Sequence, residues 1–349
     1  MPFLNSLVQH VCEIHRLLPL FETQAHMDFS TLYTVVQGRG RSFTLQPQFV
    51  GSVDGKQAYS PRPNQSTYAF GGWRPYFNKQ WPTGTSKSAF KDYCLAHDLA
   101  TPQSWNAPLQ TTTPYIAKPF HGSFGKGFSG PLSAGESLAS FSGATHYCEQ
   151  FIMGRSAKAW YWDNRLACLY IEDCPIVIAN GKNTVRELIC ARAPDHALTE
   201  KWLQKIEWHL VEAFCRFQGV SLDQIPDDGK TVSIDFRFSG FLSRQSDDNL
   251  NILKHPEIAG GSIVKQFQDS GPLFWKSIPE EKRLATLYTV DAVVDADEKV
   301  WFLELNCNPL GHPDVYRYMF EGFLGPATKV PPSLKINEPE SAHRSPLAH

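Results

Sequence analysis

Apolar and polar residues alternate most regularly in the stretch 288–313. Positions 290–294 alternate as a strand does, 297–299 are polar and predict a turn, and 300–305 return as a second apolar run. Side chains two residues apart in a strand point to the same side, so each arm has two distinct faces. The pattern predicts a β-hairpin.

The predicted hairpin carries three side chains with oxygen donors. Asp291 lies in the first arm, and Glu304 and Asn306 share one face of the second. Carboxylate and amide oxygens suit Mg²⁺, a hard ion that keeps water ligands and bridges to phosphates. The alternative is that these residues are solvated on the outer face of an antiparallel sheet. The apolar run WFLELNCNPLG and the poor strand propensity of Asn argue against that alternative, but the hairpin alone leaves both interpretations open.

Weaker patterns precede the hairpin. Residues 1–21 predict an amphipathic helix, and the runs TLYTVV and SFTLQPQFV predict strands. The segment 60–84 is rich in proline, glycine and aromatic residues, which we expect to pack under long loops. Ser86 can cap the helix that follows it, and Lys87 and Lys91 share one face of that helix, where lysines are usually solvated.

The middle of the chain predicts five further elements. They are a strand or connector at 147–152, a hairpin at 157–171, helices at 184–191 and 199–218, and a strand at 231–238. Arg237 falls on the polar face of the last strand, which makes it a candidate to face a substrate. Residues 239–282 are polar and predict a loop-rich insertion or mobile lid, and the Pro-rich tail from 326 predicts disorder.

Composition places the chain among ordinary globular proteins of more than one subdomain. It has 349 residues, 42% of them hydrophobic and 19% charged, which is long enough for two or three substantial cores. A net charge of -2 gives no electrostatic case for nucleic acid or an anionic membrane as a partner. We find no segment long and apolar enough to span a bilayer.

The eight cysteines are scattered and form no CxxC pair. Their spacing therefore favours neither a zinc site nor a disulfide framework. Because the start of the chain also lacks a basic export signal, the sequence predicts a cytoplasmic protein with reduced thiols.

A glycine-rich loop provides a candidate phosphate site. A predicted strand at 115–118 leads into HGSFGKGFSG, where the glycines allow backbone N–H groups to approach phosphate oxygens and Lys118 and Lys126 add positive charge. The order GxxxxGK[ST] of a Walker A loop is missing. A glycine-rich hairpin turn without a ligand is the alternative.

Taken together, the order of these motifs resembles the ATP-grasp family over about residues 85–323. Lys87 is followed by DLATP, Lys118 by GSFGKG, and then comes an acid-led hinge, EQFIMG. The family pattern ends with an Asp strand and an ExN strand, which Asp291 and the Glu304 run match. The joint set is far more specific than any single motif.

Two details refine the resemblance. The 13 residues from Asp291 to Glu304 (304 − 291) give the same register as D-alanine:D-alanine ligases. The segment IVIANGKNTVRELI is similar to one in cyanophycin synthetase, glutathione synthetase and related amino-acid ligases.

The resemblance implies an α+β fold of three subdomains in which ATP is held between two antiparallel sheets. We expect an N-terminal subdomain at 1–84, a central one with the glycine-rich loop at 85–155, and a C-terminal one at 156–325 with the insertion at about 239–282. Residues 326–349 would form the disordered tail.

The resemblance also implies the site residues. Nucleotide contacts would come from Lys87, Lys118, Ser123, Phe124, Gly125, Lys126, Glu149, Gln150, Phe151 and Ile152. Asp291, Glu304 and Asn306 would bind Mg²⁺, with Mn²⁺ as an alternative. The catalytic candidates are Arg237, Arg244, Lys126 and His312.

The chain departs from the family pattern at three places. Thr289 stands where D-alanine ligases often have Arg, Glu172 and Asp173 replace a usual basic residue, and Ala179-Asn180 replaces a Gly-Asp pair. The charge that contacts the γ-phosphate therefore has to come from elsewhere, and Arg237, Arg244 and Arg186 are the candidates by residue type. His312 can accept a proton from the amine or orient substrate, and a packed histidine is the alternative.

The implied activity is an ATP-dependent carboxylate-amine ligase that forms an acylphosphate and releases ADP and phosphate. Its substrates would be small carboxylates and amines of the amino-acid or peptide class, and a homodimer is left open. The alternatives are an ATP-grasp small-molecule kinase and a non-catalytic nucleotide-binding scaffold. The intact acids and lysines favour an enzyme.

Overall fold

The computed structural model describes residues 3–53, 56–106, 112–120, 127–138, 141–193, 199–238, 240–242 and 251–328. Contacts divide the chain into two compact units, Met1–Pro75 with Met319–His349 and Tyr76–Tyr318. The three-subdomain boundaries expected above stay a prediction. The tail expected to be disordered lies outside the described residues from 329 onward.

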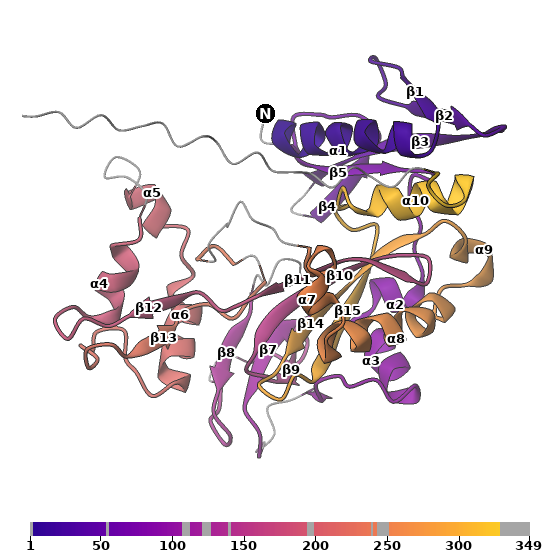
Figure 1. Cartoon of the computed structure of the whole chain (residues 1–349). Coiled ribbons are helices and arrows are strands. Elements are labelled where there is room, and N and C mark those ends of the chain that lie inside the picture. Colours follow the sequence, from indigo (N-terminus) through magenta and orange to yellow (C-terminus); the bar gives the residue numbers. More distant parts are fainter. Residues whose placement is uncertain are drawn as a thin grey trace, which may run out of the picture. The chain divides into compact units, whose positions relative to one another are not determined.

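The first unit contains the predicted N-terminal helix and an antiparallel sheet (Figure 1). Its elements are α1 (Leu4–Leu17), η1 (Leu18–Leu20), β1 (Thr23–Met27), β2 (Thr34–Gly38), β3 (Arg41–Val53), β4 (Lys56–Ser60) and β5 (Thr67–Arg74). Strands pair in the order β1-β2-β3-β4, with β5 also on β3. The helix buries Ile14 and Leu17, as its predicted amphipathic pattern requires. The aromatic residues that we expected under long loops lie partly in a strand instead, because Phe70 and Trp73 are buried in β5 and pack edge-on at 4.7 Å. From Met319 on, α10 (Val315–Leu324) also belongs to this unit.

The second unit is built on a four-stranded antiparallel sheet with the order β11-β10-β14-β15. The strands are β10 (Arg155–Trp162), β11 (Arg165–Glu172), β14 (Leu287–Val294) and β15 (Val300–Cys307). Both predicted hairpins are thus confirmed, with the second turned at residues 295–299. One face of the sheet forms the main core of the unit, where Ala159, Leu169, Val290 and Phe302 are buried together.

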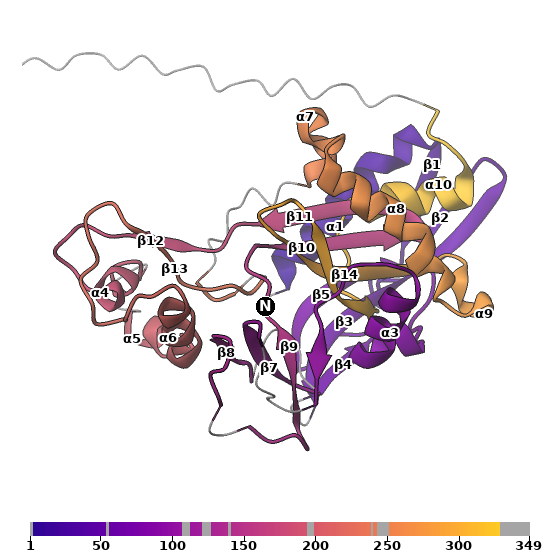
Figure 2. The same ribbon diagram turned by 90° about the horizontal axis from the view of Figure 1, so that it is seen from below.

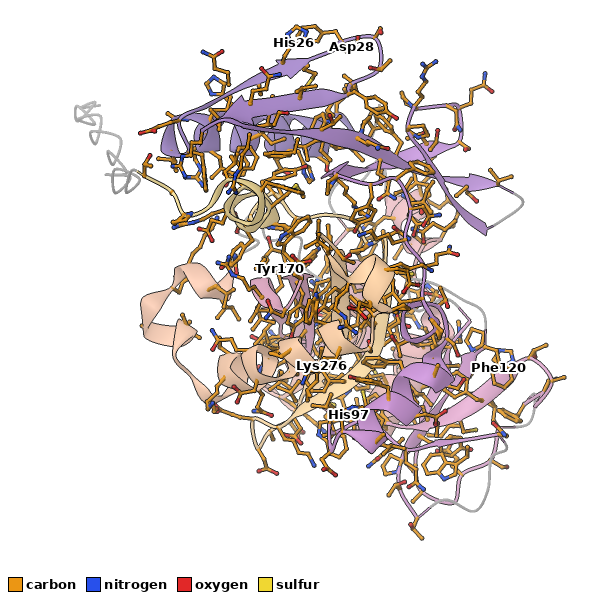
Figure 3. The ribbon with its side chains drawn as sticks, turned by 90° about the vertical axis from the view of Figure 1, so that its right-hand side faces the viewer. His26, Asp28, His97, Phe120, Tyr170 and Lys276 are labelled. Atoms are coloured by element: carbon orange, nitrogen blue, oxygen red, sulfur yellow. The ribbon has the colours of Figure 1, made fainter. Side chains whose placement is uncertain are left out.

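Three helices cover that apolar face. They are α2 (Pro82–Thr85), α3 (Lys87–Ala96) and α8 (Ser262–Lys276). Ser86 caps α3 as predicted, because its side chain accepts from the Ala89 N–H at 3.3 Å. Tyr93 donates to the Leu273 carbonyl at 2.6 Å, so the ends of α3 and α8, marked by His97 and Lys276 in Figure 3, lie side by side.

The prediction of a loop-rich insertion is wrong for the described part, residues 251–282. This part contains η2 (Ile252–Lys254), α7 (Pro256–Ala259), the start of α9 (Glu280–Arg283), and the 15-residue helix α8, which lies across the sheet in Figure 2. Val264, Phe267 and Phe274 of α8 are buried in the main core. Gly271 and a proline inside the helix obscured the apolar stripe in the sequence. The remaining residues of the predicted insertion, 239 and 243–250, lie outside the described residues.

A second antiparallel sheet has the order β6-β9-β7-β8. Its strands are β6 (Ser104–Trp105), β7 (Tyr115–Pro119), β8 (Ser129–Leu132) and β9 (His146–Gln150). The predicted strand at 115–118 is confirmed, and the predicted strand or connector at 147–152 is a strand up to Gln150.

A small α/β segment completes the second unit. It contains β12 (Ile176–Ile178), α4 (Val185–Cys190), α5 (Thr199–Leu203), α6 (Trp208–Phe217) and β13 (Thr231–Ser233). The helix predicted over 199–218 is interrupted, because Lys205 and Ile206 donate to carbonyls three residues back and the chain turns there. The strand predicted over 231–238 ends at Ser233, since the Arg237 N–H donates to the Asp235 side chain in a tight turn.

The predicted fold class, α+β with antiparallel sheets, is confirmed. Among the residues that the structure describes, none of the helices combines the length and the apolar composition that a bilayer crossing requires.

Candidate functional site

The second face of the β11-β10-β14-β15 sheet carries a row of polar residues in register. Glu304 pairs with Asp291 across β15 and β14, Asp291 pairs with Lys158 on β10, and Lys158 pairs with Tyr170 on β11. Directly paired residues on one face have Cβ atoms about 5 Å apart. The sheet thus brings residues from four strands into one line.

A second row runs beside the first. Asn306 pairs with Thr289, Thr289 with Trp160, and Trp160 with Cys168. Both rows belong to the same face because their members are two residues apart along each strand. Tyr170, labelled in Figure 3, and Cys168 are therefore the outer ends of the two rows.

The three predicted metal ligands lie together at the β14–β15 end of the two rows. The Asn306 amide nitrogen donates to Asp291 Oδ2 at 2.9 Å and to Glu304 Oε1 at 3.4 Å. Burial, reinforced by the charge of Asp291, raises the pKa of Glu304 above its ordinary value. Two half-buried carboxylates that repel each other, with an amide whose oxygen can turn toward them, fit a hard divalent cation.

Two lysines flank these acids. Lys87, the first residue of α3, lies with its Nζ 3.6 Å from Glu304 Oε2, and Lys158 Nζ lies 2.6 Å from Asp291 Oδ1. The rings of Trp160 and Phe238 lie 5.9 Å and 5.8 Å from the Lys158 ammonium. The sequence analysis missed Lys158. Its signal was a lysine between Ala157 and Ala159 in a strand that is otherwise apolar.

Lys118 of β7 and Glu149 of β9 meet on the second sheet. Lys118 Nζ bonds Glu149 Oε1, and Lys91 Nζ lies 2.8 Å from Glu149 Oε2. Burial acts to raise the pKa of Glu149, but the charges of Lys118 and Lys91 outweigh it and hold that pKa below its ordinary value. The expectation that Lys91 is solvated is wrong, because its side chain is only 5% exposed and also donates to the Pro102 carbonyl at 2.7 Å.

The two groups of charges are electrostatically connected. Lys87, Lys118 and Lys158 each act to lower the pKa of Glu304, against the larger effect of its burial. The acids of the first sheet therefore lie within reach of lysines from α3, β7 and β10.

Two of the three hinge residues after Glu149 donate their backbone N–H groups to carbonyls of the protein. The Gln150 N–H donates to the Gln103 carbonyl at 2.8 Å, and the Phe151 N–H donates to the Pro114 carbonyl at 2.9 Å. The Phe151 ring packs on Phe217 of α6, with 5.2 Å between the ring centroids. Among the described residues, the Ile152 N–H has no protein acceptor.

Four predicted nucleotide contacts, Ser123, Phe124, Gly125 and Lys126, lie outside the described residues, as does Arg244. At the far side of the glycine-rich sequence, the Phe128 ring lies 5.2 Å from the Lys118 ammonium. This contact places the end of the loop next to Lys118.

Arg237 is engaged by two other acids, Asp235 and Glu207. Its Nε and Nη2 each donate to an Asp235 oxygen at 2.9 Å, and its Nη1 donates to Glu207. Burial acts to lower the pKa of Arg237, but Asp235 and Glu207 raise it above its ordinary value. Arg186 is likewise paired with Asp223 at 2.8 Å. Thr289 is fully buried, so its side chain does not replace the missing arginine.

His312 lies at the outer end of the two rows. Its Nε2 bonds the Tyr170 hydroxyl, and its ring centroid lies 5.6 Å from that of Trp160. Burial lowers the pKa of His312 to about 4, so the ring is neutral at physiological pH. A base this weak is poorly matched to proton abstraction from an amine.

No protein-family model matches the chain, and no curated protein matches it in sequence. In structure, the chain is similar to a bifunctional glutathione synthetase from Pasteurella multocida, with 13% identity, a TM-score of 0.36, and coverage of 86% of this chain and 41% of that one. It is also similar to a D-alanine–D-alanine ligase from Bacillus anthracis complexed with ATP, with 10% identity, a TM-score of 0.33, and coverage of 65% and 56%. An L-amino acid ligase from Bacillus licheniformis matches with 12% identity, a TM-score of 0.31, and coverage of 71% and 48%. This chain thus spans between 41% and 56% of the length of these proteins. It is also similar to the ATP-grasp ligase PsnB complexed with minimal precursor, with 15% identity, a TM-score of 0.31, and coverage of 69% and 58%.

Proposed function

We propose that this chain is an ATP-dependent ligase that joins a carboxylate to an amine through an acylphosphate. The observation that supports this most directly is the register row of Glu304, Asp291 and Lys158, with Asn306 beside it. Two carboxylates and an amide beside an ammonium group would suit a divalent cation and a transferred phosphoryl group, which supports the proposal.

The lysines of α3 and β7 are suited to the phosphates of ATP. Lys87 faces Glu304, so a phosphate oxygen bridged to a cation at Glu304 would lie within its reach. Lys118 can turn from Glu149 to a phosphate because Lys91 still compensates the buried carboxylate. The adenine would then lie along the hinge, with the Ile152 N–H as a donor.

Asp291, Glu304 and Asn306 would hold Mg²⁺, or Mn²⁺ in its place. When bound, such an ion neutralises charge on the phosphates and polarises the transferred group. Lys158 would supply the positive charge that the sequence lacks at Thr289, because its Nζ already lies 2.6 Å from Asp291.

The chemistry has two steps. A substrate carboxylate oxygen attacks the γ-phosphorus, and the bond from phosphorus to the bridging oxygen breaks to release ADP. The amine nitrogen then attacks the acyl carbon, inorganic phosphate leaves with the bonding electron pair, and the amine gives up a proton. Positioning and charge neutralisation by the lysines account for most of the protein's contribution.

The test is a screen of amino acids, peptides and small carboxylates in pairs with Mg-ATP, with ADP and phosphate release and product mass as readouts. We expect release that needs both a carboxylate and an amine, with a product mass equal to the two substrates minus water. A phosphorylated product that forms without an amine would identify a kinase instead. No ADP release with any pool, together with measurable ATP binding, would identify a non-catalytic scaffold.

A further inference from the structure

A second group of ligand-type side chains lies at the outer end of the polar face, apart from the acids of β14 and β15. Cys168 of β11, His312 and Asp314 each present a donor atom, and these atoms all lie within 4.8 Å of one another. Cys168 is separated by 144 residues from His312 (312 − 168), so no spacing motif could reveal the group.

The donor atoms converge in a largely buried place. The Cys168 side chain is fully buried, Asp314 is 9% exposed, and the His312 side chain is 20% exposed, which leaves a route from solvent. His312 Nδ1 lies 3.7 Å from Asp314 Oδ2. Two ligands of one tetrahedral zinc ion are about 3.3–3.8 Å apart, given bond lengths of about 2.0–2.3 Å.

The hydrogen bonds around these residues orient their donor atoms. His312 accepts at Nδ1 from the Asp314 N–H at 3.2 Å, so the ring proton is on Nε2 and points to the Tyr170 hydroxyl. Asn251 donates to Asp314 Oδ2 at 2.8 Å, and Lys254 donates to Oδ1 at 2.6 Å. Metal-bound histidines and carboxylates are usually fixed by such outer partners.

Asn251 is itself held firmly. It is 5% exposed, and its Oδ1 accepts from the backbone N–H groups of Leu169 and Leu253 at 3.1 and 3.2 Å. Asn251 thus links the carboxylate of Asp314 to the backbone of β11 and of η2.

We propose that Cys168, His312 and Asp314 form a metal site of their own, which takes Zn²⁺ or a similar borderline-soft divalent ion. One sulfur, one nitrogen and one oxygen donor suit such an ion and not Mg²⁺, which prefers oxygen alone. Three protein ligands leave the fourth tetrahedral position to water. Lys254 would still donate to Oδ1 of Asp314. The ion would bind Nδ1 of His312 in place of the hydrogen bond from the Asp314 N–H.

Binding has a defined proton balance. Cysteine binds a metal ion as its thiolate, so the Cys168 thiol gives up its proton when the sulfur–metal bond forms. Formation of that bond therefore releases about one proton per ion bound. This release distinguishes the site from adventitious binding to carboxylates.

The site has a structural consequence that does not depend on the proposed ligase activity. Asn306 is the last of the three proposed magnesium ligands along the chain, and His312 and Asp314 follow it by six and eight residues. An ion that ties both of them to β11 fixes the segment that leaves the sheet just after Asn306. We therefore expect Zn²⁺ to stabilise the chain whether or not it is an enzyme.

The experiment uses the full chain, freed of metal by chelation, with Co²⁺ and Zn²⁺ as probes. We expect a thiolate-to-cobalt charge-transfer band that saturates at one Co²⁺ per chain, displacement of that band by Zn²⁺, and about one proton released for each ion that contributes to the band. Cys168→Ser should remove the band, while Cys215→Ser, a change at another buried cysteine, should keep it. Asn251→Ala should weaken Zn²⁺ binding about 10- to 100-fold.

Two further arms keep the test decisive. If Cys168→Ser does not fold, His312→Gln replaces it and should also remove the band, while Glu304→Ala should retain it. A band that persists in His312→Gln, binding without proton release, or no stoichiometric binding of either ion would overturn the proposal.

Discussion

Lys158 Nζ lies 2.6 Å from Asp291 Oδ1, across a directly paired position of two neighbouring strands. Both side chains are about one-fifth exposed, at 20% and 21%, so the pair is accessible to a substrate from the polar face. A carboxylate that lies between a lysine and a second carboxylate has two possible partners. The Asp291 carboxylate can bind the Lys158 ammonium group. Alternatively, it can coordinate a metal ion while the ammonium group binds an anion such as a phosphate.

This relationship leads to a prediction for Lys158→Met. We expect the rate of ADP release at saturating Mg-ATP to fall about 100- to 1,000-fold, as it does when one charged donor to a transition state is removed. Lys158→Arg should recover part of that loss, because it keeps the charge. Without nucleotide, Lys158→Met should bind Mn²⁺ more tightly, since a competing cation has gone.

The matched control is Lys265→Met. Lys265 is 71% exposed and pairs with Asp269, one turn further along α8. We expect neither turnover nor Mn²⁺ affinity to change in this variant. A Lys158→Met protein that turns over within about twofold of the parent would contradict the assigned role.

Glu304 gives a prediction about the metal itself. In Glu304→Ala, turnover should disappear while circular dichroism shows a folded protein, because the side chain is 32% exposed and lies outside the main apolar core. Mn²⁺ affinity, measured by calorimetry, should also fall. Loss of a residue that only hydrogen-bonds a metal ligand costs roughly 10- to 100-fold, and loss of a direct ligand should cost more. Glu257→Gln, at a 66% exposed carboxylate, serves as the control and should change neither. Unchanged turnover in Glu304→Ala would remove Glu304 from the ligand set.

Local patterns explain which parts of this architecture the sequence could predict. The hairpin of β14 and β15 was predictable because its alternation, its polar turn and the spacing of Asp291 and Glu304 all lie within 20 residues. The role of Lys158 was not, because its partner Asp291 is 133 residues away and strand order is a tertiary property. Lys91 shows the same limit, since only the fold brings Glu149 to it.

Buried charge at Glu149 leads to a prediction about stability. Glu149 is 1% exposed and bonds two lysines, so Glu149→Gln leaves both ammonium groups without their counterion. Breaking a buried ion pair by removal of one partner costs about 3–5 kcal/mol of the free energy of unfolding. Urea unfolding at neutral pH, with Glu136→Gln at a partly exposed carboxylate as the control, measures this difference.

The same residue predicts a dependence on pH. The two lysines hold the folded-state pKa of Glu149 below its ordinary value of 4.5. Its contribution is therefore fully present above pH 4.5 and is lost as the pH falls through the lower pKa of the folded state. The difference in free energy of unfolding between the parent and Glu149→Gln should shrink on acidification below that pH. A difference that stays constant down to acid unfolding would show that Glu149 is not ionised in the folded protein.

Gly271 provides a prediction that separates packing from helix propensity. It lies inside α8, where alanine would normally stabilise a helix by about 1 kcal/mol. A Cβ at this position would lie 2.8 Å from the Asn164 carbonyl oxygen and 3.0 Å from Tyr161 Cε1, and the backbone of the β10–β11 turn cannot yield cheaply. We expect Gly271→Ala to lower the free energy of unfolding by about 1–3 kcal/mol, as overpacking does. Gly260→Ala is the control, because a Cβ there meets nothing within 4 Å and φ is -92°, so its effect should be neutral or slightly stabilising. If Gly271→Ala raised the urea midpoint, α8 would not pack against the β10–β11 turn, and the expectation of a mobile lid would be restored.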